Sequence, residues 1–289
     1  MAMGEWEVLE AVPLPREEVE LGEGVASAPR LRLQDRVAVI TGGNGGLGLA
    51  AAAAFAREGA HLVLAARSEE SLANAASSLK EHGVETLAVP TDVGSPEQVE
   101  RLFDRALREF GQVDILVNNA GVSGPTAPLH EISVEDWERT LSVDLTSAFL
   151  CAKAVLPGMM QRGRGNILNV SSIFGKRAYP YRTPYAAAKW ALIGLTQSLA
   201  HEVGRYGVRV NAICPGPIAG ERIERVWRER AHRRGIPFEA IRDKMVRMAA
   251  LRRIPEAEEF ADLALFLVSD ASRGMTGQAL NISGGMEMR

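Results

Sequence analysis

Short β-branched runs alternate with longer stretches of helical pattern from Arg36 to the end of this 289-residue chain. When strands and helices alternate in this way, each strand reaches its neighbour through a right-handed crossover, and the sheet is parallel and covered on both faces. The sequence therefore predicts an α/β fold: a single doubly wound domain over residues 31–289, with a parallel seven-stranded sheet and helices on both faces. The expected strands are Val37–Thr41, His61–Ala65, Thr86–Pro90, Ile115–Asn118, Ile167–Val170, Val208–Ile213 and Ala279–Ile282.

Helix start signals stand between these runs. Ser95 followed by Pro96 predicts an N-cap and a proline at the first helical position, and Gln98 is expected to be the capping-box partner. Ser68 and Ser133, each closely followed by acidic residues, give the same kind of signal. These caps place helices directly after the second, third and fourth expected strands or their loops.

A cluster of glycines follows the first expected strand directly, between Thr41 and Gly48. A glycine-rich turn between a strand and a helix lets the backbone approach a pyrophosphate, whose charge then lies at the helix N-terminus. The position of the cluster therefore predicts dinucleotide binding by a Rossmann domain. The candidate cofactor-binding residues in the turn are Gly42, Asn44, Gly46, Leu47 and Gly48.

Tyr185 and Lys189 are four residues apart in an expected helix, so their side chains share one face. A free phenol donates protons poorly at neutral pH, because its pKa is near ~10. A cation within about 4–6 Å stabilises the phenolate and brings proton transfer towards neutral pH. This spacing is common on solvated helices, so the pair indicates chemistry only together with the motifs around it.

Several motifs in the same order resemble the classical short-chain dehydrogenase/reductase family. Besides the glycine turn, Asn118–Gly121 closes the fourth expected strand, Ser172 precedes Tyr185 by thirteen residues, and Pro215-Gly216 follows the sixth strand. The resemblance extends from about Leu33 to the C-terminus. It implies an NAD(P)-dependent oxidoreductase that transfers hydride between a nicotinamide and a carbonyl or secondary alcohol of a small molecule.

The resemblance also implies roles for individual side chains. In the family a tyrosine gives a proton to the carbonyl oxygen, a serine hydroxyl hydrogen-bonds the same oxygen, and a lysine holds the cofactor ribose. These roles map onto Tyr185, Ser172 and Lys189. Ser171 is expected to point to the other face, because side chains alternate along a strand. Asp144 is the fourth catalytic candidate, since it stands where the family has an asparagine of the proton relay.

The choice between NADP and NAD depends on the end of the second strand. An acidic residue there accepts hydrogen bonds from the ribose 2′-hydroxyl and repels a 2′-phosphate. Ala66 occupies this position, and Arg67 follows with a guanidinium that can pair with phosphate. The pattern favours NADP over NAD, although Gly45 replaces the basic residue that many NADP-dependent members carry in the glycine turn. The alternative for Arg67 is a solvated surface charge.

Further cofactor contacts are implied by the resemblance outside the glycine turn. Asp92, with Val93 beside it, resembles the residue that touches adenine, and Asn119 resembles the residue near the adenine ribose. Gly220 departs from the pattern, since many members have there a threonine that contacts the nicotinamide carboxamide. The other implied cofactor-binding residues are Ala120, Gly121, Tyr185, Lys189, Pro215, Gly216 and Ile218. No metal site is expected.

Residues 221–250 resemble the variable substrate lid of the family. They hold eight arginines and Lys244 against five acidic residues, and Lys176, Arg177 and Arg182 flank the active-site loop. One interpretation of these charges is an anionic substrate, and the other is a solvated amphipathic lid. The C-terminal pattern is most similar to 3-oxoacyl-carrier reductases and to polyol or sugar-acid dehydrogenases, which the sequence does not separate.

The composition is that of an ordinary globular protein, with 46% hydrophobic residues, 24% charged residues and a net charge of −3. This balance predicts no general attraction to nucleic acid. No apolar run reaches the ~18–20 residues that cross a bilayer, so no membrane association is expected. Cys151 and Cys214 stand in apolar surroundings and predict core positions, which is typical of a reducing, cytoplasmic compartment.

The first thirty residues differ from the rest, with seven glutamates against Arg16 and Arg30. They fit neither a secretory signal nor a mitochondrial presequence. We expect residues 1–30 to form an acidic, partly ordered N-terminal extension, with a strap that contacts another subunit as the alternative. Family members mostly form homotetramers, here expected through helices at about 137–160 and 184–205.

Two other function classes compete with a reductase or dehydrogenase. A nucleotide-sensing regulator on the same fold typically lacks the Tyr/Lys pair, which this chain keeps as Tyr185 and Lys189. A sugar-nucleotide epimerase or dehydratase is disfavoured by the glycine spacing and the chain length. Redox turnover with bound nucleotide separates the enzyme from the regulator.

Overall fold

The computed structural model describes residues 31–289, apart from the side chain of residue 222, and the predicted extension 1–30 lies outside the described residues. Seven parallel strands form one sheet in the order β3-β2-β1-β4-β5-β6-β7. This confirms the predicted doubly wound fold and each of the predicted strands. The strands are β1 Val37–Thr41, β2 His61–Ala66, β3 Thr86–Pro90, β4 Ile115–Asn118, β5 Gly165–Val170, β6 Val208–Pro215 and β7 Ala279–Ile282.

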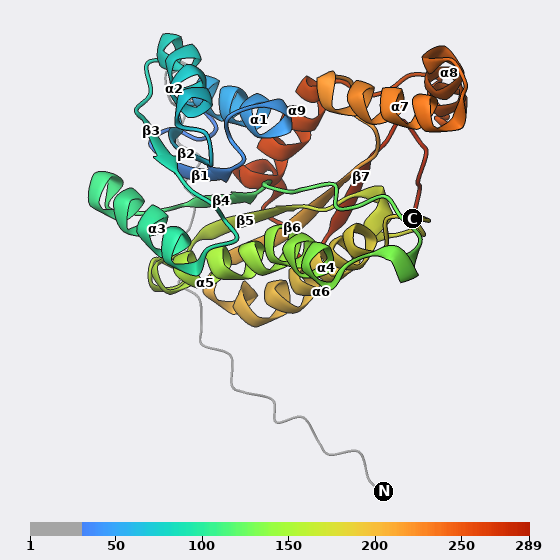
Figure 1. The fold of residues 1–289 in the computed structure, drawn as a ribbon. Coiled ribbons are helices and arrows are strands. Elements are labelled where there is room, and N and C mark those ends of the chain that lie inside the picture. Colours follow the sequence, from blue (N-terminus) through green and yellow to red (C-terminus); the bar gives the residue numbers. More distant parts are fainter. Residues whose placement is uncertain (1–30) are drawn as a thin grey trace, which may run out of the picture. The chain divides into compact units, whose positions relative to one another are not determined.

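Helices cover both faces of the sheet, and Figure 1 shows the two layers. Helices α1, α2 and α9 contribute to the core on one face, while α3, α5 and α6 pack against the other. Helices α7 and α8 pack against each other through a small apolar cluster of their own. The helices are α1 Gly46–Arg57, α2 Glu69–Ser78, α3 Pro96–Phe110, α4 Val134–Leu141, α5 Ser147–Gln161, α6 Thr183–Val203, α7 Glu221–Arg234, α8 Phe238–Met248 and α9 Ala257–Val268.

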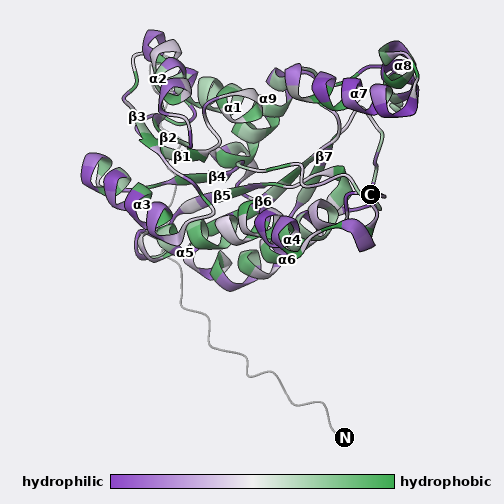
Figure 2. Ribbon diagram, in the orientation of Figure 1, coloured by the Kyte–Doolittle hydropathy of each residue, from purple (hydrophilic) through white to green (hydrophobic). Residues whose placement is uncertain are grey.

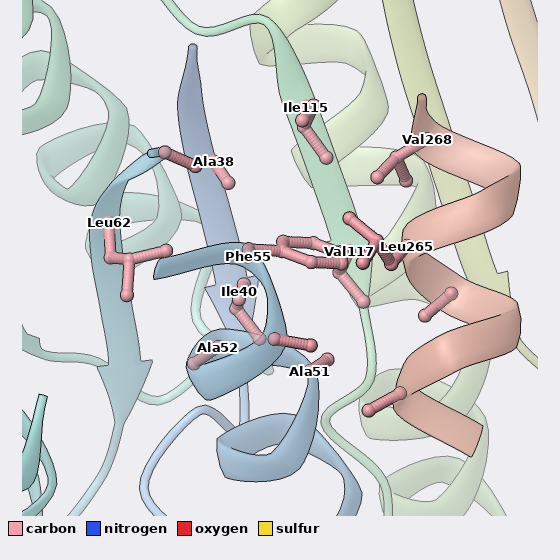
Figure 3. Packing of buried hydrophobic residues seen from close by; sticks show 14 of the residues in the cluster. Ala38, Ile40, Ala51, Ala52, Phe55, Leu62, Ile115, Val117, Leu265 and Val268 are labelled. Carbon is pink, nitrogen blue, oxygen red and sulfur yellow. The ribbon is translucent and has the colours of Figure 1, made fainter. Parts of the chain in front are cut away.

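The packing of α1 shows why this face of the sheet tolerates a close helix (Figure 3). The Phe55 side chain of α1 is fully buried and lies between the sheet and α9, near Val117 and Leu265. Ala51 and Ala52 are also fully buried, and their small side chains let the helix backbone approach the strands. Figure 2 shows the resulting pattern, with hydrophobic strands and inner helix faces and hydrophilic outer faces on α2, α3, α7 and α8.

The predicted helix caps are present, with one correction. The hydroxyls of Ser68, Ser95 and Ser133 each accept a hydrogen bond from the backbone N–H three residues ahead. The capping-box role predicted for Gln98 is wrong, because its side-chain oxygen accepts from the N–H of Asp92 at 2.9 Å. Gln98 thereby ties the start of α3 to the loop after β3, where an adenine contact is predicted.

Helices α4 and α5 form one continuous helix, Val134–Gln161, joined through a π-helical turn at Ser142–Thr146. Within the described residues this is the one helix long and apolar enough, by length and composition, to cross a membrane, whereas the apolar runs of the sequence predict none. Its apolar residues have an evident partner in the sheet, since Cys151, Val155 and Met159 are buried in the core. Both cysteines are buried and free, as predicted, and burial raises the pKa of the Cys151 thiol to about 12.

The strand order places the candidate site. Strands β1 and β4 are neighbours in space although β2 and β3 separate them in the chain. Crossovers leave β1 and β4 in opposite directions at this point, and doubly wound folds bind their ligands outside the carboxyl ends of strands at such a point. The glycine turn follows β1 and the Asn118–Gly121 motif closes β4, so both predicted motifs lie at this edge.

Candidate active site

The glycine turn holds α1 unusually close to the end of β1. Gly42 and Gly46 have φ angles of 65° and 51°, in the left-handed region that favours glycine. A Cβ atom on Gly48 would lie 2.2 Å from the carbonyl oxygen of Gly42, so a side chain there would collide with backbone. The turn therefore exposes backbone, rather than side chains, at the N-terminus of α1.

Asn119, directly after β4, holds this turn in place through hydrogen bonds. Its side-chain amide donates to the carbonyl oxygens of Thr41 at 2.9 Å and Gly42 at 3.1 Å. In return, the Thr41 hydroxyl accepts from the N–H groups of Asn119 and Ala120, both at 3.0 Å. Thr41 is not among the predicted cofactor-binding residues, although it is the last residue of β1 before the glycines, a position that could have indicated it. The predicted residues Asn119 and Ala120 lie against the predicted glycine turn.

The N-terminus of α1 fits a bound pyrophosphate. Among the residues that the structure describes, no side chain caps this helix at Gly45, and its first turn contains no acidic residue. The first N–H groups of a helix lack intrahelical acceptors, and the helix dipole favours an anion there. The Asn44 amide points elsewhere, since it donates to the Ser71 hydroxyl of α2 at 2.8 Å. Asn44 would thus offer its backbone to a cofactor.

The end of β2 lies beside the same turn. The N–H of Gly42 donates to the carbonyl of Ala65 at 2.7 Å, and the exposed Arg67 follows directly after β2. Ala66 carries no acidic group, so nothing on the strand end would repel a 2′-phosphate. At the end of β3, Asp92 is half-buried, and its carboxylate accepts from the N–H of Gly94 at 3.0 Å.

Tyr185 and Lys189 lie one turn apart at the start of α6, a helix that begins at Thr183 with Pro184 in its first turn. The residue Lys189 is buried, at 4% exposure, and its Nζ donates to the carbonyl of Val170 at 3.1 Å. The same Nζ lies 5.7 Å from the centre of the Tyr185 ring. The structure therefore brings the predicted cation and phenol together.

The two adjacent serines after β5 have different partners. The Ser172 hydroxyl oxygen accepts from the N–H of Phe174 at 3.2 Å and lies 3.5 Å from the carbonyl of Pro215. The Ser171 hydroxyl donates to the carbonyl of Lys189 at 2.9 Å, which commits it to the backbone of α6. Ser172 is thus the serine whose hydroxyl proton is held only by a long contact and can turn to a ligand.

Asp144 lies in the π-helical turn between α4 and α5, and its side chain is fully buried. One carboxylate oxygen accepts from the N–H of Val122 at 2.6 Å, and the other lies 4.0 Å from Lys189 Nζ. A Cβ atom on Gly121 would meet both groups, at 3.0 Å from Asp144 Oδ1 and 3.5 Å from Lys189 Nζ. π-helical turns are rare and often mark functional sites. Sequence periodicity gives no sign of this one.

The segment after β6 closes the site towards α7. Gly216 donates its N–H to the carbonyl of Ile282 at 2.8 Å, and a Cβ atom there would lie 2.9 Å from the Cβ of Ser283. Pro215 is buried and Ile218 is half-buried. Gly220, with a φ of 135°, leads into α7. The predicted nicotinamide-side residues therefore lie in one short, backbone-paired segment.

The basic residues of the active-site loop bind backbone. Lys176 Nζ donates to the carbonyls of Ala279 at 2.5 Å and Arg289 at 2.8 Å, and Arg177 donates to the carbonyl of Met286 at 3.1 Å. These two cations hold the C-terminal segment against the loop. Their hydrogen bonds are therefore made to the protein's own main chain.

On the lid helices the charges are mostly exposed or paired nearby. Arg228 pairs with Glu224 at 2.7 Å, and Arg242 pairs with Asp243 at 3.1 Å. The exposed Arg225 lies on α7, beside the apolar cluster around Trp227 that joins α7 to α8. Within residues 31–289, no group of three or more His, Cys, Asp or Glu side chains is placed to hold a metal ion.

Comparison with known proteins identifies relatives over most of the chain. A family model described as enoyl-(acyl carrier protein) reductase matches residues 42–287. A Streptomyces violaceoruber protein assigned as ketoacyl reductase 1 of the granaticin polyketide synthase is 39% identical over 252 residues, which cover 86% of this chain and 92% of the relative.

Solved structures agree with the fold. L-sorbose reductase from Gluconobacter frateurii, complexed with NADPH and L-sorbose, is 35% identical and has a TM-score of 0.85, covering 90% of this chain and 99% of that chain. An NAD⁺-bound xylitol dehydrogenase is 33% identical with a TM-score of 0.84, covering 88% of this chain and all of that one. These neighbours include both NADPH-bound and NAD⁺-bound proteins.

Proposed function

This chain belongs to the classical short-chain dehydrogenase/reductase family of NAD(P)-dependent oxidoreductases, and we propose that it interconverts a ketone and a secondary alcohol of a small molecule with NADP(H) as the preferred cofactor. The observation that carries this proposal is the buried Lys189, held by Val170 beside Tyr185 and Asp144. A buried ammonium next to a phenol is costly to maintain unless it serves chemistry or a compensating pair.

In the reducing direction, Tyr185 gives its phenolic proton to the substrate oxygen as negative charge develops there. Ser172 donates a hydrogen bond to the same oxygen, and Lys189 places a positive charge beside the phenolate that remains. Removing one such donor commonly costs about 3 kcal/mol of transition-state stabilisation. The nicotinamide, when bound, supplies the hydride, and in the oxidising direction it accepts one. The reduction thus adds the hydride to the carbonyl carbon and the Tyr185 proton to the oxygen. This gives the alcohol and leaves Tyr185 as a phenolate.

The preference for NADP(H) rests on Arg67 and on the absence of an acidic residue at Ala66. The exposed guanidinium follows β2 next to the turn, where it can form two charge-assisted hydrogen bonds with a 2′-phosphate. Solved relatives bind either cofactor, so the local charge at this strand end is the feature that supports the choice.

The cofactor is proposed to extend along the carboxyl ends of β1, β2, β3 and β4. Gly42, Gly46, Leu47 and Gly48 would offer backbone to the pyrophosphate, and Asn44 would do the same through its main chain. Asp92 and Val93 would border the adenine, with Asn119, Ala120 and Gly121 beyond them. Lys189 would hold the nicotinamide ribose, and Pro215, Gly216 and Ile218 would contact the nicotinamide.

We propose a hydroxylated or acyl substrate with its reacting carbonyl between Ser172 and Tyr185. The relatives named above act on acyl and polyol-type compounds, as their names state, and the two classes stay open. An anionic substrate draws its support from exposed lid cations such as Arg225, since Lys176 and Arg177 already bind the C-terminal segment.

Assembly as a homotetramer and a cytoplasmic location are also proposals. Three large apolar side chains on α4, α5 and α6 are exposed, namely Val134 at 66%, Phe149 at 49% and Trp190 at 53%. Such side chains on neighbouring helices are typical of a subunit interface. Free, buried Cys151 and Cys214 are compatible with a reducing compartment. Light scattering coupled to size exclusion measures the subunit number directly.

The experiment that tests the proposed function is a substrate panel read at the absorbance of reduced nicotinamide. It pairs NADPH and NADH with ketones, 3-oxoacyl thioesters and ketoses, and NADP⁺ and NAD⁺ with polyols. Turnover of at least one class, with higher kcat/KM for the phosphorylated cofactor, supports the proposal. Tight nucleotide binding with no turnover in any arm would instead indicate a nucleotide-sensing regulator.

A further inference from the structure

The loop between Ser172 and Tyr185 carries an aromatic stack that ends on the proposed proton donor. The rings of Phe174 and Tyr179 are stacked, with centroids 3.5 Å apart and planes 6° from parallel. The Tyr179 ring in turn meets the Tyr185 ring edge to face, at 6.3 Å and 73°. The edge-to-face contact of Tyr179 with Tyr185 is an arrangement that aromatic quadrupoles favour, whereas the Phe174 and Tyr179 rings lie directly face to face. Tyr179 is therefore packed against the catalytic candidate itself.

The stack is anchored at both ends of the loop. Phe174 also donates its N–H to the Ser172 hydroxyl at 3.2 Å. The residue that stacks on Tyr179 therefore also orients Ser172, the proposed hydrogen-bond donor to the substrate oxygen. The guanidinium of Arg182 lies 5.9 Å from the centre of the Tyr179 ring. Arg182 is itself buried, at 9% exposure, and donates to the carbonyl of Ser123 at 2.9 Å.

Arg182 connects the stack to the loop after β4. Arg182 donates to the carbonyl of Ser123, and the carbonyl of the preceding residue, Tyr181, accepts from the N–H of Ala127 at 3.0 Å. Two hydrogen bonds thus join the segment 123–127 to the segment 181–182. A buried guanidinium that satisfies a backbone carbonyl is a fixed group, because leaving it unpaired in the interior is costly. The Tyr179 ring consequently has little freedom to move.

We propose that Tyr179 is a positioning residue: its ring, fixed by Phe174 and Arg182, holds the Tyr185 phenol in the orientation that proton transfer requires. The inference rests on the proposed function in one respect, namely that Tyr185 is the proton donor. Proton transfer needs donor and acceptor within hydrogen-bond reach, and small misplacement of a catalytic group reduces the rate steeply. The aromatic ring, and not the Tyr179 hydroxyl, carries this role.

The kinetic test compares three variants with a substrate found in the panel. Tyr179→Ala removes the ring and should lower kcat at least about tenfold, equivalent to about 1.4 kcal/mol in the barrier, while the Kd for NADPH stays within about threefold. Tyr179→Phe keeps the ring and should retain kcat within about twofold. Tyr181→Ala is the matched control, since it removes a ring of equal size from the same loop. Tyr181 is 59% exposed, so its removal should leave kcat unchanged.

A second measurement does not depend on turnover. The chain contains four tyrosines, so incorporation of 3-fluorotyrosine gives four fluorine resonances, and Tyr185→Phe assigns the one of interest. Tyr179→Ala should shift or broaden the Tyr185 resonance, and Tyr181→Ala should not. If Tyr179→Ala does not fold, Tyr179→Leu replaces it. A chain without any redox turnover would refute the proposed function while this spectrum still tests the contact.

Any one of three results would overturn the positioning role. The first is an unchanged Tyr185 resonance in folded Tyr179→Ala, and the second is a kcat of that variant within twofold of wild type. The third is a Tyr179→Phe variant as impaired as Tyr179→Ala, especially with the loss in substrate KM, which would assign the Tyr179 hydroxyl to substrate binding instead.

Discussion

Replacement of Gly48 by alanine tests the close approach of α1 to the glycine turn. The new Cβ would lie 2.2 Å from the carbonyl oxygen of Gly42 and 2.6 Å from the Asn119 amide nitrogen. Ordinary contact begins at 3.4 Å, so the helix or the turn must move by about 1.2 Å. Such a shift also pulls the Asn119 amide from the carbonyls of Thr41 and Gly42, which it holds at 2.9 and 3.1 Å.

The opposing effects of Gly48→Ala can be weighed. Overpacking against backbone costs roughly 1–3 kcal/mol, and each lost hydrogen bond about 1 kcal/mol. Alanine in place of glycine inside a helix contributes only about 0.5–1 kcal/mol in the other direction. The clash therefore wins, with a net loss of about 3 kcal/mol in the free energy of unfolding, or a fall in Tm of roughly 6–12 °C for a domain of this size.

The assay combines thermal unfolding with NADPH binding followed by fluorescence. Gly194→Ala in α6 is the matched control: it is the same change in a helix, no atom of the described residues lies within 4 Å of the new Cβ, and it should raise Tm by about 1–4 °C. We expect Gly48→Ala to lower NADPH affinity at least about tenfold, since a displaced backbone N–H loses a hydrogen bond to the charged pyrophosphate, worth roughly 1.5–3 kcal/mol. Equal Tm shifts in the two variants, or unchanged NADPH affinity in Gly48→Ala, would refute the reasoning.

Three further predictions concern charge. Arg67→Asp should lower the ratio of kcat/KM for NADPH over NADH at least about tenfold, because a carboxylate would face the 2′-phosphate; a ratio within threefold of wild type would leave Arg67 as a surface charge. Asp144→Asn should keep the hydrogen bond from Val122, made at 2.6 Å, but remove a negative charge that opposes phenolate formation. The alkaline fall of the reduction rate should therefore move to lower pH, and superimposable pH–rate profiles would contradict this. The bidentate Arg253, at 2.5 and 2.7 Å, lowers the pKa of Glu259 to about 2. Because the pKa is lower in the folded protein, the ionised Glu259 stabilises the fold at pH values above the ordinary carboxyl pKa of 4.5, and this stabilisation is lost as the pH falls towards 2. The Tm of Glu259→Gln should therefore lie below that of wild type at pH 7, and the difference should narrow below pH 4.5. A Tm difference independent of pH would exclude the ion pair as its cause.

The fold was predictable because its signals are local. Each strand is a short run bounded by turn residues, and the serine caps at Ser68, Ser95 and Ser133 lie where the sequence indicates. The partner of Gln98 was not predictable, since its competing acceptor role towards Asp92 arises only when the loop after β3 folds over α3. A capping box and a loop tether have the same sequence pattern.

The candidate site was predictable in its residues more than in its contacts. Motifs place Tyr185, Lys189 and Asp144 near one another, and the structure brings Lys189 within 4.0 Å of Asp144. The π-helical turn that carries Asp144 leaves no mark in a pattern of apolar residues, because one extra residue per turn changes periodicity only locally. Contacts between a loop and a helix, such as Tyr179 on Tyr185, depend on how the non-periodic loop folds against the helix.

The charges of the active-site loop show the same limit. Lys176 and Arg177 could face a substrate or the protein, and only the folded C-terminal segment decides between these partners. Long cationic side chains reach many acceptors, so sequence position alone does not define their target. The continuous helix formed by α4 and α5 is a further case, since its length depends on a turn that the sequence does not signal.

The central claim, proton donation by Tyr185 beside a buried Lys189, is tested most directly by Tyr185→Phe. The measurement is kcat and the NADPH Kd on the same preparation, with the substrate found in the panel. We predict a kcat lower by about 10²–10⁴-fold, because the general acid is gone, and a Kd within about threefold, because the ring still packs on Tyr179. Retention of more than about a tenth of the wild-type kcat, with the cofactor bound normally, would contradict it.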